Sequence, residues 1–161
     1  MGGNVLQSGS VTAGHNATWI TDGVIADGGP IAASNKVLGS IFGADFNSTG
    51  DQPLVLPASI NAFQLTGIIV TNASVSLNAA FGGFYPLSSK AGSPIVLASQ
   101  SYAALTASNL LMQPTLTAFA TTTRFSSAIL TGLWAIYLSL TVPQGSTATA
   151  DVYLTGLDLS A

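Results

Sequence analysis

Charged side chains are almost absent from this chain: three residues are basic, six are acidic, and none of the acidic residues is glutamate. Asp, Glu, Lys and Arg usually make up about a quarter of a soluble domain, whereas here they make up 6%. A surface helix needs a polar, commonly Glu- and Lys-rich, outer face, so this composition disfavours helical folds. It also predicts that much of the surface is covered by other protein in the working state.

The residues that remain favour β-structure, because Thr, Val, Ile and aromatic side chains suit strands. The clearest strand is Leu133–Thr141. Alternate residues of a strand point to opposite faces. One face would hold Trp134, Ile136, Leu138 and Leu140, and the other would hold Ala135, Tyr137, Ser139 and Thr141. The pattern predicts a half-buried strand.

Shorter runs with the same signature recur between turn markers. Further strands are predicted over 63–71, 74–80, 94–98, 116–122 and 149–159. Gly82-Gly83 is typical of a hairpin turn, and Ser99–Leu111 is the one segment where a helical turn is expected. Seven or eight short strands with this punctuation predict an all-β fold, a jelly-roll-like antiparallel β-sandwich.

The first part of the chain has a different texture. Its apolar pieces are short and interrupted by glycine, and none is long enough to bury a core. We therefore expect an extended Gly-rich N-terminal arm over residues 1–45, used for attachment or packing between subunits, and a β-sandwich domain over residues 46–161. A disordered tail would be more highly charged and poorer in Trp and Ile.

The residue types needed for catalysis are scarce. There is no cysteine, His15 is the only histidine, and no Gly-x-Ser-x-Gly motif accompanies it. Asp22-Gly23 and Asp27-Gly28 are typical turn dipeptides. Calcium at these turns is an alternative, although no ladder of alternating oxygen ligands is present. We expect no catalytic residues, no metal and no cofactor, and a glycan depolymerase is the enzymatic alternative.

Two classes of partner are disfavoured by the distribution of charge. Lys36, Lys90 and Arg124 are too few for the phosphate contacts that nucleic-acid affinity requires. The uncharged stretch Phe125–Val142 approaches the length of a membrane-spanning helix, but Ser, Thr and Gly interrupt it and no basic cluster flanks it. We therefore expect neither nucleic acid nor a membrane as a direct partner.

One N-terminal segment carries a recognisable signature. Ser8–Pro30 reads SGSVTAGHNATWITDGVIADGGP. It resembles a motif of the form G-x-V-T-x-G-H-x-A-x-W-x-x-D-G-V-I-x-D-G-G found in structural proteins of tailed bacteriophages and prophages. Asn16 departs from this pattern, because a small or aliphatic residue usually follows the histidine.

Two later segments are similar to the β-domain of phage head decoration and head-fibre proteins. They are GGFYPLSSKAGSPIVLASQSYAALT, over 82–106, and LWAIYLSLTVPQGSTATADVYLTGLDL, over 133–159. The resemblance implies a virion protein without enzymatic activity, a homotrimer of jelly-roll subunits. Its partners would be its own copies and the major capsid protein or another virion component. Its place would be the exterior of the phage head, where it would act as a decoration or cement protein.

Two sets of contact residues follow from these hypotheses. In the arm, an aromatic residue with aliphatic neighbours suits a desolvated anchor on a partner, and the predicted contacts are His15, Trp19, Ile20, Asp22, Val24, Ile25 and Asp27. The arm could instead fold back on its own domain. If the chain is a head- or tail-fibre or receptor-binding protein attached through its arm, the expected exposed aromatic contacts are Tyr85, Tyr102 and Tyr153.

Overall fold

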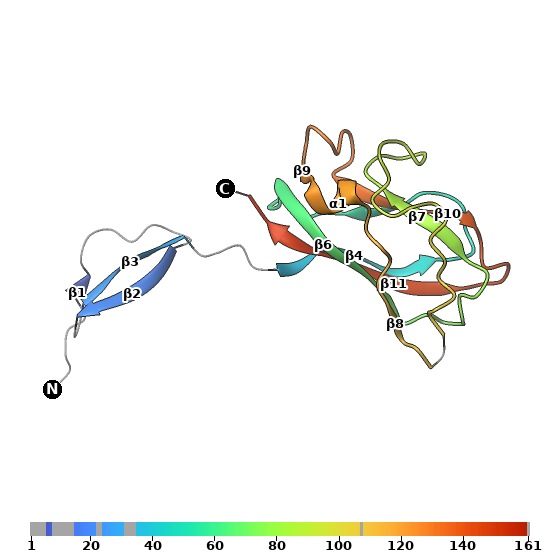
Figure 1. Ribbon diagram of the computed structural model, residues 1–161, viewed down its shortest axis with the longest axis horizontal. Helices are drawn as coiled ribbons and strands as arrows, with labels where there is room; N and C mark the ends of the chain where they lie inside the picture. The colour runs from blue at the N-terminus through green and yellow to red at the C-terminus, as the bar shows by residue number, and fades with distance from the viewer. Residues whose placement is uncertain (1–5, 8–14, 22–23, 31–34, 107, 161) are drawn as a thin grey trace. The chain divides into compact units, whose positions relative to one another are not determined.

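The structure is a computed structural model that describes residues 6–7, 15–21, 24–30, 35–106 and 108–160 (Figure 1). The chain divides into two compact units, Met1–Ala33 and Ser34–Ala161. The second unit begins with a strand that the sequence assigned to the arm. The boundary therefore lies at residue 34 rather than at residue 46.

The first unit contains a small three-stranded sheet. Its strands are β1 (Leu6–Gln7), β2 (His15–Thr21) and β3 (Val24–Pro30), in the order β1-β3-β2. β2 pairs with β3 in antiparallel fashion, and β1 pairs with β3 in parallel. The sequence did not predict these strands, because glycine-rich segments such as this one have low intrinsic strand propensity.

The second unit is a β-sandwich of two antiparallel sheets (Figure 1). The larger sheet has the order β4-β11-β6-β8, with β9 also paired to β6, and the smaller has the order β5-β10-β7. The strands are β4 (Asn35–Asp45), β5 (Gln52–Val55), β6 (Ala62–Thr71), β7 (Phe81–Tyr85), β8 (Leu111–Met112), β9 (Arg124–Ser126), β10 (Ala135–Val142) and β11 (Thr149–Asp158).

The strand pairs of the sandwich are nested along the chain. The first strand of this unit, β4, pairs with the last, β11, and β5 pairs with β10. Inside them, β6 pairs with β9, and Phe84 of β7 forms an isolated antiparallel bridge with Val96. Successive strands from β4 to β7 alternate between the larger and the smaller sheet. The connectivity is that of one long hairpin rolled up into two layers.

Alternation of apolar residues explains the core. Along β11, every second residue from Ala150 to Gly156 is buried and the residues between them are half-buried. β10 was predicted to be buried on one face only, yet Ala135 and Ser139 on its other face are also buried. The largest fully buried side chains include Phe46, Phe63, Phe84, Tyr102 and Phe125. Three strand predictions, those matching β6, β10 and β11, are confirmed.

Gly82 and Gly83 lie inside β7, so the predicted hairpin turn is wrong. A Cβ at Gly82 would come within 2.5 Å of the Cα of Leu140, on the paired strand. A Cβ at Gly83 would come within 2.3 Å of the backbone oxygen of Val96. The two glycines are therefore needed because other backbone segments approach β7 closely.

Other local predictions are corrected by tertiary contacts. Residues 116–122 were expected to form a strand, but α1 (Ala118–Thr122) is a short helix with Thr117 as its N-cap, and the Thr117 side chain accepts a hydrogen bond from the Ala120 N–H. Residues 99–111 contain no helix among those described, because Ser101 bridges to Phe81 and the Tyr102 N–H bonds to a carbonyl of the neighbouring chain segment. Residues 74–80 contain a bend and a turn but no strand, and within 94–98 only Val96 pairs.

The uncharged stretch 125–142 spans part of β9, a loop and β10. Within the part of the chain that the structure describes, no helix has the length and apolar character required to cross a membrane.

Candidate functional site

The carboxylates of the sandwich accept hydrogen bonds from nearby loops and strand ends. Asp45 accepts from the Asn47 N–H at 2.7 Å. Asp151 accepts from the Gly43 N–H at 2.8 Å and from the Asn72 side chain at 2.9 Å. Among the described residues, no group of three His, Cys, Asp or Glu side chains is arranged to hold a metal ion. These aspartates hold loops and strand ends in place.

Asp51 links the loop after β7 to β10, the central strand of the smaller sheet. It accepts hydrogen bonds from the buried hydroxyl of Ser139 and from the Ser89 N–H. Partial burial raises its pKa, but these hydrogen bonds and the positive charge of Lys90 outweigh that effect, so the pKa lies below the usual value. The carboxylate explains why a serine is tolerated at a fully buried position of β10.

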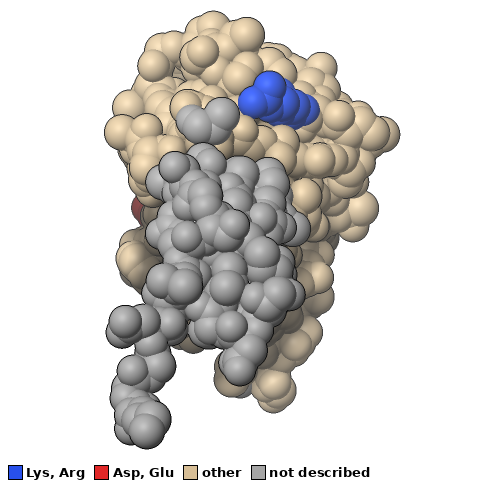
Figure 2. All heavy atoms as spheres, turned by 90° about the vertical axis from the view of Figure 1, so that its left-hand side faces the viewer, with Lys and Arg blue, Asp and Glu red and all other residues tan. Residues whose placement is uncertain are grey.

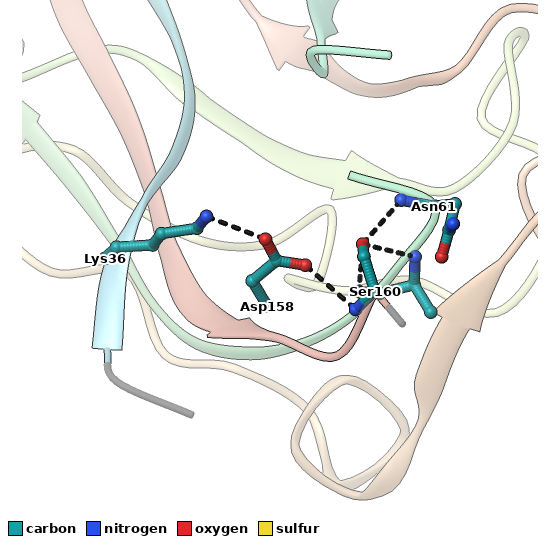
Figure 3. A network of polar contacts seen from close by, with 5 residues as sticks. Lys36, Asn61, Asp158 and Ser160 are labelled. Atoms are coloured by element: carbon teal, nitrogen blue, oxygen red, sulfur yellow. Dashed lines mark hydrogen bonds and ion pairs between the residues drawn. The ribbon is translucent and has the colours of Figure 1, made fainter. Parts of the chain in front are cut away.

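A polar network ties the end of β11 to neighbouring segments (Figure 3). Lys36 of β4 donates to Asp158 at 2.7 Å, and the Ser160 N–H donates to the other carboxylate oxygen at 3.0 Å. The Ser160 hydroxyl accepts from the Asn61 N–H at 2.8 Å. The hydrogen bonds, that from Lys36 foremost, lower the pKa of Asp158 to about 2. The network anchors the loop between β5 and β6.

The predicted arm contacts lie in the first unit. His15, Trp19 and Ile20 belong to β2, and Val24, Ile25 and Asp27 belong to β3, while Asp22 lies outside the described residues. The register places Trp19 opposite Ile25. The two residues therefore form one cross-strand pair, a relationship that the sequence did not predict. Their role as partner contacts stays a prediction.

The predicted aromatic contacts of the fibre hypothesis are mostly inside the sandwich. Tyr85 is buried, and Tyr102 is fully buried with its ring edge-on to Phe46. Burial raises the pKa of both tyrosines. The prediction that these two side chains are exposed is wrong, because the rolled connectivity encloses both of them. Tyr153 is half-buried on β11 and its ring meets Phe42 edge-on, at 5.8 Å between ring centroids.

The outward side of the larger sheet is a nearly uncharged surface, which we call the outer sheet face. Strand register places these residues on it: Val37, Ser40 and Phe42 of β4, Asp151, Tyr153 and Thr155 of β11, Gly67, Ile69 and Thr71 of β6, and Leu111 of β8. Phe42 is 71% exposed, and Val37 and Leu111 are also exposed. Its charged members are Asp151, which already accepts two hydrogen bonds, and Arg124 of β9, which pairs with Gln64 and donates to the Leu159 carbonyl.

The space-filling view is consistent with this scarcity of charge. On the face of the molecule in Figure 2, the atoms that are not grey are predominantly uncharged, with a small blue patch of Lys or Arg. Exposed apolar residues scattered singly are ordinary, but a contiguous apolar patch marks an interaction site. The sequence contained the composition that indicates such a surface, but not its position.

A pocket of about 260 Å³ lies at one end of the sandwich. It is lined by Leu56, Ala58, Ile60, Asn61, Ser127 and Trp134. None of these side chains carries a charge, and the sequence analysis selected none of them as a ligand contact. The indole N–H of Trp134 is buried and meets no acceptor among the described residues. The pocket therefore has apolar walls, and one of its lining residues carries a buried hydrogen-bond donor that the fold does not use.

Comparison of the chain with protein-family models, with curated proteins and with solved structures found no match. The functional interpretation therefore depends on the contacts within this chain and on the resemblance described above.

Proposed function

We propose that the chain is a non-enzymatic structural protein of a tailed-phage particle, a decoration or cement protein on the exterior of the head. It binds the assembled head, through the major capsid protein or another virion component, and stabilises it. The resemblance of segments 8–30, 82–106 and 133–159 to phage structural proteins supports this function. So does the scarcity of charge, because a chain with so few charged side chains needs protein partners to cover its surface.

The nested strand pairs support a jelly-roll fold for the sandwich. Jelly rolls are two-sheet structures built from Greek keys, and they recur in viral capsid proteins. The pairs β4 with β11, β5 with β10, β6 with β9 and β7 with the Val96 segment have this order. Fold alone does not define function, so the argument for an assembly subunit depends on the surface.

The single observation that carries the proposal is the outer sheet face. Burial of its exposed apolar side chains, Phe42 above all, would stabilise an interface by about 1.5–3 kcal/mol for one large side chain. Its charged residues, Asp151 and Arg124, have opposite signs and are both already hydrogen-bonded. The face can therefore lie against a neighbouring subunit around a threefold axis without burying an unpaired charge. We propose that it joins the subunits of a homotrimer.

The N-terminal unit supplies the attachment to the head in this proposal. The register of β2 with β3 pairs Trp19 with Ile25, and an aromatic residue paired with a β-branched one is a suitable anchor for a groove on a partner. In this proposal, the small sheet of the first unit binds the head and the sandwich contacts its own copies.

Replacement of Phe42 by lysine tests the self-association. Phe42→Lys places a charge in the outer sheet face, so we expect the trimer to dissociate at micromolar concentration in light scattering. Leu97→Lys is the matched control, because Leu97 is 54% exposed and its segment adjoins the smaller sheet. A Phe42→Lys protein with the wild-type mass would refute the role of this face.

The proposed function can be tested on phage heads prepared with and without the protein. Heads that lack the protein should disassemble at a lower temperature, and addition of the purified full-length chain should restore the wild-type temperature. Trp19→Ala should weaken binding to the heads and leave the sandwich folded. An unchanged disassembly temperature, together with no binding to empty heads, would overturn the decoration hypothesis.

A second candidate is a head- or tail-fibre or receptor-binding protein attached to the virion by its N-terminal arm. The exposed ring of Phe42 beside Tyr153 favours it, because surface aromatic rings are common in recognition sites. Purified full-length protein would then compete with phage for adsorption to host cells. Competition that Phe42→Lys abolishes, without any effect of the protein on head stability, would favour this function over decoration.

A further inference from the structure

The end pocket is built from two segments that are distant in sequence but fixed to each other. The connection between β5 and β6 contributes Leu56, Ala58, Ile60 and Asn61, and the connection between β9 and β10 contributes Ser127 and Trp134. The Leu56 N–H donates to the Trp134 carbonyl at 2.9 Å. The pocket walls are therefore joined by the backbone.

The polar network in Figure 3 also holds the connection between β5 and β6, through Asn61. Asn61 donates its backbone N–H to the Ser160 hydroxyl, and Ser160 is held in turn by Asp158. The Asn61 side-chain amide makes no hydrogen bond to the described residues, nor does the Ser127 hydroxyl. Both groups are exposed and line the pocket. The pocket thus has a fixed backbone and side-chain polar groups that are free to bind.

The indole of Trp134 adds a donor that the fold does not use. A buried polar group without a partner is uncommon in native proteins and calls for an explanation. The N–H has almost no accessible surface, so a ligand oxygen in the pocket can accept from it only when the ring rotates and exposes it. The ring itself packs edge-on against Phe63, with centroids 5.9 Å apart. That contact limits how far the indole can move.

We propose that this pocket binds a neutral saccharide ring, such as the terminal unit of a glycan. The volume lies just below the range of about 300–1,000 Å³ typical of sites for drug-sized ligands, which suits one ring. Apolar walls fit the C–H face of a pyranose. The exposed Asn61 amide and Ser127 hydroxyl supply directional hydrogen bonds to its oxygens, and the Trp134 N–H adds a third when its ring rotates. The lining carries no charge, so a neutral sugar is favoured over an acidic one.

Intrinsic fluorescence can report binding at this site. The chain has two tryptophans, and the Trp19→Phe variant leaves Trp134 as the only reporter. We expect its emission to shift on titration with one or more of the methyl pyranosides of glucose, galactose, mannose and N-acetylglucosamine. For a ligand of this size the Kd is expected at about 1 mM. Glucuronic acid should bind more weakly than the neutral sugars.

Two variants and a matched control locate the binding. Asn61→Ala, measured with the same reporter, should weaken it by about fivefold, which corresponds to the loss of one hydrogen bond. Asn78→Ala is the control, since Asn78 is also exposed but is absent from the pocket lining. Trp134→Phe keeps an aromatic ring and removes the N–H, and it should weaken binding to a similar extent when measured by calorimetry.

Three results would overturn the proposal. One is the absence of any response to the four neutral pyranosides up to about 50 mM, fifty times the expected Kd. Another is an affinity that neither Asn61→Ala nor Trp134→Phe changes, which would place binding elsewhere. The third is saturation by an apolar probe such as indole with no response to sugars, which would identify the pocket as a site for an apolar side chain.

Discussion

The two glycines of β7 give the sharpest test of how the sandwich is packed. In Gly83→Ala the added Cβ would lie 2.3 Å from the Val96 oxygen, a severe overlap, and 3.0 and 3.1 Å from backbone atoms of Leu97 and Ala98. Backbone atoms cannot rotate away as a side chain can. The whole segment around Val96 must therefore move away from β7.

The expected magnitude follows from what that movement disrupts. Three backbone hydrogen bonds join Phe84 to Ile95 and Val96, at 2.8–3.2 Å. Each contributes about 0.5–1.5 kcal/mol, and overpacking of a full core costs about 1–3 kcal/mol. If the segment shifts enough to lose one or two of these bonds, the free energy of unfolding falls by about 2–5 kcal/mol. For a chain of this length, Tm falls by about 5–15 °C.

Urea denaturation at a fixed protein concentration measures this loss, because the stability of the proposed trimer would depend on concentration. Gly50→Ala is the matched control. Its nearest neighbour would be the Ser48 side chain at 3.3 Å, so the change should stay within about 0.5 kcal/mol of wild type. A Gly83→Ala protein as stable as Gly50→Ala would refute the close packing of β7 against the Val96 segment.

Three further predictions concern single polar groups. The pKa of Asp158, lowered to about 2 chiefly by the hydrogen bond from Lys36, lies below its unfolded value, so its stabilisation is present above about pH 4 and lost as pH falls towards 2. Asp158→Asn should therefore reduce the free energy of urea unfolding at pH 7, by less than about 1 kcal/mol because the pair is exposed, and should make no difference near pH 2. Ser139→Ala should cost about 1.5–3 kcal/mol in urea unfolding, because the hydroxyl bonds to the Asp51 carboxylate, and a neutral effect would contradict that bond. Tyr102 should remain neutral at about pH 11, where an exposed tyrosine is ionised, and an ultraviolet titration with a normal midpoint would contradict its burial.

Sequence reasoning found the strands whose apolar alternation is regular. β6, β10 and β11 were predicted within a few residues of their observed bounds. It missed β4, because Gly39 and Gly43 interrupt the apolar pattern of 35–45. In the structure, a Cβ at Gly39 would lie 2.8 Å from the Leu54 side chain, so this glycine allows the edges of the two sheets to meet. The need for glycine in β4 therefore comes from a contact between the two sheets, which the local sequence pattern does not reveal.

The candidate sites were less accessible to prediction than the fold. Trp134 was assigned to the inner face of a strand, and nothing nearby in sequence indicated that it would line a pocket with Asn61. Phe42 was treated as part of the arm, whereas the register of β4 with β11 brings it to Tyr153. Both sites join segments that are about 70 to 110 residues apart in the chain.

The sequence by itself determined that the protein is built from strands and that it presents little charge, since both properties depend on residue types and their two-residue period. Only the tertiary structure decided which strands pair, which tyrosines are enclosed and which apolar side chains are left exposed. The physical reason is range. Alternation acts between neighbours along the chain, whereas the nested pairing of β4 with β11 and β5 with β10 brings together residues from opposite ends of the domain.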